Sequence, residues 1–267
     1  MTRVAIHGAA GRMGRNLLEA CIDDPAVELA AALEDVGHPT LGEDAGVLIG
    51  RAPLGIPVSS DPSASEFDAV VDFTRPEGAL ALVEHCRTAG TPMVIGTTGF
   101  TPPQRARVAA AANEIPLVLA PNMGVGVNLL LGLVERAARA LGDEYDVEII
   151  EAHHRHKVDA PSGTALQLGE MAAAGRGHRL EDRSVFNRQG HTGERARGTI
   201  GFSTVRGGDI VGEHTVLFAG SGERIELTHR ASSRMVFAQG AMRAAIWLPQ
   251  QPPGLYDMGD VLGLSDT

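Results

Sequence analysis

The sequence predicts an α/β protein with two domains, the first built on a doubly wound parallel sheet and the second on an α+β arrangement with an open mixed sheet. In the first half of the chain, short apolar runs alternate with helical patterns, as in βαβ units. Beyond residue 198, strand-like runs follow one another without intervening helices. A length of 267 residues also exceeds that of most single domains.

The first domain is expected to span residues 1–124. Its predicted strands cover residues 3–7, 27–33, 68–73, 92–96 and 115–120. Its predicted helices cover residues 11–23, 76–89 and 102–113. The second and third of these helices open on Pro76 and Pro102, and proline is favoured in the first turn of a helix.

The second domain is expected to span residues 125–233. Its predicted helices cover residues 127–141 and 162–174, and its strands residues 147–150, 199–205, 210–218 and 223–229. A last helix over residues 233–247 ends before Pro249 and is expected to return to the first domain, which residues 234–267 would complete.

Composition excludes several classes of function. A formal charge of -10 argues against nonspecific binding to nucleic acid or to an anionic membrane. Cys21 and Cys86 are too few for a disulfide framework, and no signal-peptide pattern precedes the first strand. No apolar stretch approaches the roughly 20 residues that span a bilayer. The sequence therefore predicts a cytoplasmic enzyme.

The segment between the first strand and the first helix carries glycines at three-residue spacing, Gly8, Gly11 and Gly14. Glycine permits a tight turn and lets backbone N–H groups at a helix start meet a pyrophosphate. Such a glycine triplet is also compatible with a purely structural turn. Its position between a strand and a helix favours a nucleotide site, with contacts from Gly8, Ala9, Ala10, Gly11, Arg12 and Met13.

Glu34 directly follows the predicted second strand and lies 20 residues after Gly14. This is about the spacing at which an acidic residue reaches the adenine ribose hydroxyls. Asp35 follows rather than an arginine, so a 2′-phosphate would meet two carboxylates. This predicts a preference for NADH, with NADPH possible because Arg12 offers some positive charge.

Two later strand ends are candidates for contacts with the nicotinamide, because ligands of doubly wound sheets lie across the carboxyl ends of the strands. Small residues there let the backbone approach a ring, although tight turns alone would explain them equally well. The candidates are Gly96, Thr97, Thr98, Ala120, Pro121, Asn122 and Met123.

Of the 23 lysine and arginine residues, only Lys157 is a lysine. Arginine stays protonated at physiological pH, whereas burial and neighbours can tune a lysine ammonium until it gives up a proton. Lys157 is therefore a candidate acid or base rather than an ordinary surface lysine. The histidines directly before it, His153, His154 and His156, favour this interpretation.

If residues 147–157 remain extended, His153 and Lys157 share one face of the strand. The next segment resembles a helix start, with Ser162 as the cap and N–H groups exposed at Gly163 and Thr164. A helix amino end beside histidine and lysine predicts a pocket for a small carboxylic acid.

Zinc binding by the three histidines is the competing interpretation. Adjacent histidines on opposite strand faces coordinate one ion poorly, and no cysteine lies nearby. We therefore expect no metal.

Several segments together resemble the dihydrodipicolinate reductase family. They are residues 4–14, 72–78, 94–100, 148–165, 190–195, 207–214 and 231–235. The resemblance covers nearly the whole chain, and the segment from Glu151 to Thr164 is its most specific part. It implies a Rossmann-type first domain closed by the last helix, and a second domain that binds substrate and builds a homotetramer through its sheet.

The resemblance also implies a reaction, in which NAD(P)H reduces 4-hydroxy-tetrahydrodipicolinate, a small cyclic dicarboxylate, to tetrahydrodipicolinate with loss of water. This step belongs to lysine and diaminopimelate biosynthesis. By resemblance His153 is the acid/base residue and Lys157 a proton donor. His154, Gly163 and Thr164 would hold the substrate carboxylates.

Two positions depart from the family pattern. Asp35 stands where members that use NADPH readily often carry arginine, and Met123 replaces a phenylalanine seen in many relatives. Two other functions stay open, namely another nicotinamide-dependent dehydrogenase of a small dicarboxylic or amino acid, and a dinucleotide sensor without catalysis. The sensor would need the glycine loop and Glu34, but not the pair formed by His153 and Lys157.

Overall fold

The structure is a computed structural model that describes residues 1–264. The chain divides into two compact units, which are described separately below. The first unit contains residues 1–125 and the carboxy-terminal segment from Arg234, and the second contains residues 126–233. Within the described residues, no helix is long and apolar enough to cross a membrane.

The first unit is built on a seven-stranded sheet whose neighbouring strands all pair in parallel. In sheet order the strands are β12 (Gly254–Tyr256), β6 (Pro116–Leu119), β5 (Met93–Ile95), β4 (Ala69–Asp72), β1 (Thr2–His7), β2 (Val27–Leu33) and β3 (Val58–Ser59). The sheet reverses its winding direction at β1, because later strands are added on one side of it and β2 and β3 on the other. The predicted doubly wound α/β fold is thus confirmed.

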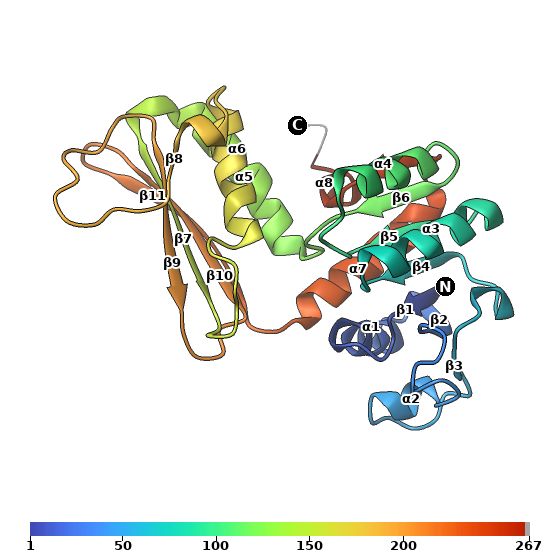
Figure 1. The fold of residues 1–267 in the computed structure, drawn as a ribbon. Helices are drawn as coiled ribbons and strands as arrows, with labels where there is room; N and C mark the ends of the chain where they lie inside the picture. The colour runs from blue at the N-terminus through green and yellow to red at the C-terminus, as the bar shows by residue number, and fades with distance from the viewer. Residues whose placement is uncertain (265–267) are drawn as a thin grey trace. The chain divides into compact units, whose positions relative to one another are not determined.

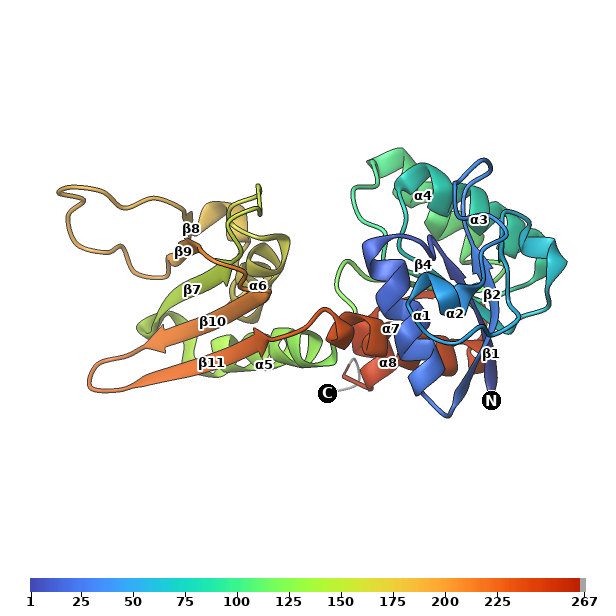
Figure 2. The same ribbon diagram turned by 90° about the horizontal axis from the view of Figure 1, so that it is seen from below.

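Helices cover both faces of this sheet. They are α1 (Arg12–Asp23), α2 (Ala45–Leu48), α3 (Pro76–Ala89), α4 (Pro102–Ala111), α7 (Met235–Trp247) and α8 (Met258–Leu262). Side chains of α1 and α7 pack against one face, and side chains of α3 and α4 pack against the other. Figures 1 and 2 show this arrangement, with α1 beside α7. The last long helix, α7, belongs to the first unit.

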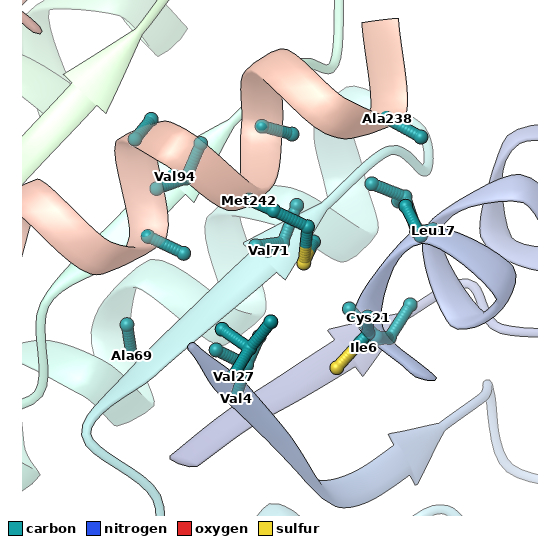
Figure 3. Close-up of a cluster of buried hydrophobic side chains, with 14 of the residues drawn as sticks. Val4, Ile6, Leu17, Cys21, Val27, Ala69, Val71, Val94, Ala238 and Met242 are labelled. Carbon is teal, nitrogen blue, oxygen red and sulfur yellow. The ribbon is translucent and has the colours of Figure 1, made fainter. Parts of the chain in front are cut away.

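The strand period of two residues decides which side chain enters which core. Val4 and Ile6 of β1 enter the core shared with α1 and α7, whereas Ala5 enters the core shared with α3 and α4. Figure 3 shows the first of these cores, where Leu17 of α1 and Met242 of α7 meet the strand side chains.

The second unit contains a mixed five-stranded sheet. In sheet order its strands are β11 (Arg224–Ala231), β10 (Gly212–Ala219), β7 (Asp146–His153), β9 (Ile200–Arg206) and β8 (Ser184–Val185). Strand β7 pairs antiparallel with β10 and parallel with β9. Its helices are α5 (Val125–Leu141) and α6 (Gly163–Gly175), which cover one face (Figure 1). The predicted α+β arrangement is confirmed.

The other face of this sheet is open in the described chain. Ile150 and Val205, which point to that face, remain 38% and 49% exposed. Val205 pairs with Ala152, two residues along β7 from Ile150, so the two side chains lie on one face.

The segment after β7 corrects one expectation. The strand ends at His153 rather than continuing to residue 157, and a turn follows in which the Lys157 N–H donates to the His154 carbonyl. Gly207 N–H also donates to the His153 carbonyl, at the point where β9 has ended. Lys157 lies outside the strand, so the alternation of side chains along β7 does not place it on the same face as His153.

Candidate active site

The glycine loop turns tightly between β1 and α1. Gly8 has a φ of 77°, a backbone conformation that favours glycine. A Cβ added to Gly14 would lie 1.9 Å from the Gly8 carbonyl oxygen, so only glycine lets α1 approach the turn this closely. Helix α1 begins after Gly11 without a side-chain cap. Its first N–H groups therefore fit the binding of a pyrophosphate.

Glu34 lies at the end of β2, beside this loop. Its Oε1 accepts a hydrogen bond from the Ala10 N–H at 2.7 Å. A cleft of about 690 Å³ extends from this contact and is lined by Gly8, Ala10, Gly11, Glu34, Asp35, His38, Phe73, Thr74, Arg75, Glu77 and Gly78. The structure thus brings together the glycines and the acidic residue that the sequence singled out. Arg75 and His38, which the sequence analysis did not place here, also line the cleft.

The side chain of Thr97, just after β5, is buried and forms hydrogen bonds within the protein. Its hydroxyl donates to Asp72 at 2.6 Å and accepts from the Thr74 N–H at 2.8 Å. Asp72, which is fully buried, also contacts His7 Nδ1 at 2.7 Å. This network joins the ends of β1, β4 and β5. A cofactor contact at Thr97 would therefore involve the backbone, whereas Thr98 is exposed.

The residues after β6 also include both buried and exposed side chains. Met123 is fully buried and packs in the core with α7, and a Cβ at Gly240 would lie 1.8 Å from its carbonyl oxygen. Ala120 is also buried, whereas Pro121 is exposed and Asn122 half-buried. The Met123 side chain is therefore part of the core and is not accessible at the surface.

In the second unit, the end of β7 presents His153 next to a buried carboxylate. His153 Nδ1 lies 2.5 Å from Glu151 Oε2. Burial lowers the pKa of His153 below its usual value, although the charge of Glu151 acts in the opposite direction. Lys157 also reduces this pKa by its charge, so it lies close enough to influence the imidazole although the strand has ended.

Lys157 itself is held in an ion pair. Its Nζ lies 2.9 Å from Asp159 Oδ1, and its side chain is 22% exposed. His154 is half-buried beside His156, with ring centroids 6.2 Å apart. Among residues 1–264, no group of three or more His, Cys, Asp or Glu side chains is arranged to hold a metal ion.

Helix α6 begins as predicted. Ser162 is its N-cap, and the Ser162 hydroxyl accepts a hydrogen bond from the Ala165 N–H. A Cβ at Gly163 would meet nothing within 4 Å, so there is open space next to the helix start. The same Ser162 hydroxyl lies 3.0 Å from His214 Nε2.

Three side chains of this site, Glu151, Arg206 and His214, were not among the residues predicted from the sequence. Arg206, on β9, makes two hydrogen bonds of 2.8 Å to Glu151. His214, on β10, meets the His153 ring edge-on with centroids 5.1 Å apart. Burial lowers the pKa of His214 to about 4, so this imidazole is neutral at neutral pH. Glu151 was detectable, since it lies two residues before His153 on the same strand face.

A glycine loop that opens a helix beside an acidic residue, and in the other unit a histidine paired with a buried carboxylate, are features typical of nicotinamide-dependent oxidoreductases, in which the cofactor carries hydride and the protein supplies the proton. Comparison with known proteins narrows this class. Residues 2–123 match the model of the dihydrodipicolinate reductase amino-terminal domain, and residues 126–262 match that of the carboxy-terminal domain. The chain belongs to the dihydrodipicolinate reductase family.

Individual relatives are similar to this chain over nearly its full length. The chain is 58% identical to a 4-hydroxy-tetrahydrodipicolinate reductase of Methylococcus capsulatus, covering 98% of each chain. It is 59% identical to that of Alkalilimnicola ehrlichii, covering 98% of this chain and 99% of the relative. Its fold matches a dipicolinate-bound dihydrodipicolinate reductase from Paenisporosarcina sp. TG-14 with a TM-score of 0.76 and 29% identity, covering 96% and 97% of the two chains.

Proposed function

We propose that this chain reduces 4-hydroxy-tetrahydrodipicolinate to tetrahydrodipicolinate, with loss of water, in lysine and diaminopimelate biosynthesis. The observation that carries the proposal is the site at the end of β7, where Glu151 contacts both His153 and the Ser162 cap of α6, and where the charge of Lys157 acts on His153. The chain is also 58% identical to such a reductase over 98% of its length. Residues 1–124, completed by 234–267, would bind the dinucleotide. Residues 125–233 would bind substrate.

The substrate is a dicarboxylate, and the second unit offers groups suited to anions. Gly163 and Thr164 form the first turn of α6, where the helix dipole favours negative charge. His154 is the nearby imidazole proposed to hold a carboxylate. The Ser162 cap fixes where this turn begins, so the carboxylate contacts are set by α6 rather than by a loop.

Loss of the 4-hydroxyl group as water would leave a conjugated imine, and a nicotinamide nucleotide, when bound, would supply hydride to it. Negative charge then develops on the reduced ring and has to be met by a proton. We assign that proton transfer to His153 and Lys157, with His153 as the acid/base residue and Lys157 as a proton donor. Both side chains are partly shielded from solvent, which strengthens their interactions with a charged ring.

The family membership implies a nicotinamide cofactor, and we propose that NADH is preferred over NADPH. Proposed contacts are Gly8 to Met13, Glu34, Gly96 to Thr98 and Ala120 to Met123. Glu34 and Asp35 place two carboxylates in the cleft where a 2′-phosphate would lie. We expect kcat/KM to be higher for NADH, and steady-state kinetics with both cofactors checks this.

A clear advantage for NADPH would contradict this preference. Arg75 would then be the first residue to test, because it lines the same cleft and could pair with the phosphate. Arg75→Gln should leave kcat/KM for NADH nearly unchanged and reduce it for NADPH. Arg107→Gln on the exposed surface of α4 is the matched control.

We further propose that the chain forms a homotetramer through the open face of the second sheet. The exposed apolar side chains Ile150 and Val205 support this, because burial of such a face favours association. Sedimentation equilibrium measures the mass directly. We also propose that it works in the cytoplasm, where its reduced nicotinamide nucleotide is produced.

The reaction is tested by following NADH oxidation with freshly generated cyclic substrate. We expect turnover that depends on both components. Tight NADH binding without turnover would instead favour the dinucleotide sensor. Oxidation of a small dicarboxylic or amino acid with NAD⁺, without reduction of the cyclic substrate, would favour a different dehydrogenase.

A further inference from the structure

Glu151 is the most deeply buried acidic side chain of the second unit that touches the proposed site. It lies near the end of β7 and is 1% exposed. A carboxylate in such a position needs partners for its charge and for its oxygen lone pairs. The hydrogen-bond partners of Glu151 come from several elements of this unit.

Three groups donate to this carboxylate. Arg206 Nη1 and Nη2 lie 2.8 Å from Oε2 and Oε1, in a two-pronged contact from β9. The Ser162 N–H donates to Oε1 at 3.0 Å, from the residue that caps α6. His153 Nδ1 lies 2.5 Å from Oε2. One side chain thus ties together the proposed acid/base residue, the carboxylate-binding helix and a neighbouring strand.

The direction of the hydrogen bond to His153 follows from the chemistry. Burial alone would raise the pKa of Glu151, but the hydrogen bonds from Arg206, His153 and Ser162 outweigh it and hold the pKa below its usual value. The side chain is therefore ionised and can only accept. His153 Nδ1 has to carry the hydrogen, which leaves Nε2 as the nitrogen that exchanges a proton with a ligand.

The surroundings of the ring hold it in this orientation. His214 of β10 contacts the imidazole edge-on, and Ser162 in turn hydrogen-bonds His214. On the same strand, a Cβ at Gly212 would lie 3.1 Å from His153 Nε2, so the absence of a side chain there gives this nitrogen room. Because His214 is neutral at neutral pH, it does not repel a protonated His153.

We propose that Glu151 is a positioning residue that selects the imidazole tautomer of His153 and aims Nε2 at the substrate. This rests on the proposed function, in which His153 transfers a proton. Glu151 itself transfers none, because both of its oxygens are occupied by donors. It acts through His153, and through Ser162 it sets the start of α6 relative to that imidazole.

Glu151→Gln tests the proposal with little change in shape. Glutamine keeps one acceptor oxygen but replaces the other with a donor nitrogen, so the side chain loses its negative charge and no longer fixes Nδ1 as the nitrogen that carries hydrogen. We expect kcat to fall about 10- to 10³-fold, less than or equal to the loss on removing His153 itself. The affinity for NADH, bound by the other unit, should not change.

The pH profile separates positioning from a merely structural role. His153 is faced by Glu151 of β7, Arg206 of β9, His214 of β10 and Lys157 of the following loop. Of these, Glu151 is the group whose charge raises the pKa of His153. Its neutralisation should therefore move the limb of the kcat profile that reports His153 to lower pH. A limb at the wild-type position would overturn the proposal.

The matched control is Glu148→Gln. Glu148 lies on the same strand but on the opposite face, and like Glu151 it is held by arginine, in its case by Arg188 and Arg195. It does not contact His153. This variant should lose stability to a similar degree while keeping the wild-type pH profile. Equal shifts of the profile in both variants would show that Glu151 has no special effect on His153.

The wild-type protein offers a test that does not depend on a folded variant. In ¹⁵N-histidine-labelled protein, the His153 signals, assigned by their loss in His153→Gln, should show hydrogen on Nδ1 in the neutral form. Hydrogen on Nε2 would overturn the proposal. If His153→Gln keeps full activity, the proposed function of His153 fails first; if it loses activity but Glu151→Gln does not, only the positioning role fails.

Discussion

His153→Gln is expected to lower kcat by about 10²- to 10⁴-fold, the contribution of a well-placed acid/base group. His153 is 8% exposed, and its ring is fixed between the Glu151 carboxylate and the His214 ring. Glutamine preserves hydrogen-bonding capacity but cannot exchange a proton near neutral pH. Single-turnover kinetics at saturating NADH would measure the chemical step directly.

The pH dependence gives a second measure of the same residue. Burial lowers the pKa of His153, so its limb of the wild-type kcat profile should lie below about pH 6.5, the usual value for histidine. This limb should vanish in His153→Gln. The control is His156→Gln, since His156 is exposed in the turn after β7 and should retain normal kcat. An unchanged limb in His153→Gln would assign the titration to another group.

The main elements of the fold could be predicted from sequence because each carries a local signal. The βαβ pattern, the prolines that open α3 and α4, and the serine that caps α6 are all local. Strands β3, β8 and β12 have two, two and three residues, too few for a periodic pattern to show. Their pairing with longer strands stabilises them, and that depends on tertiary structure.

In the second unit, residues of the candidate site could be predicted only where they are neighbours in sequence. His153, Lys157 and Ser162 belong to one short segment. Arg206 contacts the Glu151 carboxylate from β9, and His214 contacts the His153 imidazole from β10. Their positions depend on which distant strands pair with β7, and local sequence patterns do not show that. The condition that residues 147–157 remain extended is not met. Strand β7 ends at His153, and the chain then turns so that the Lys157 N–H donates to the His154 carbonyl.

Lys157→Ala is the other change for which we expect a large loss, about 10²- to 10⁴-fold in kcat if general acid catalysis is removed. The Lys157 ammonium is paired with Asp159 and close enough to His153 to influence its protonation. Alanine removes the proton donor and the positive charge together. The kinetic loss alone therefore does not distinguish proton transfer from binding of a substrate carboxylate.

Lys157→Arg separates these two roles. Arginine keeps the positive charge and binds carboxylates well through two N–H groups, but it does not release a proton at physiological pH. If Lys157 donates a proton, KM for the cyclic substrate should stay near the wild-type value while kcat remains as low as in the alanine variant. If the ammonium only anchors a carboxylate, the arginine variant should recover most of kcat. Recovery would also remove the reason for a lone lysine among so many arginines, because an arginine would then serve equally well.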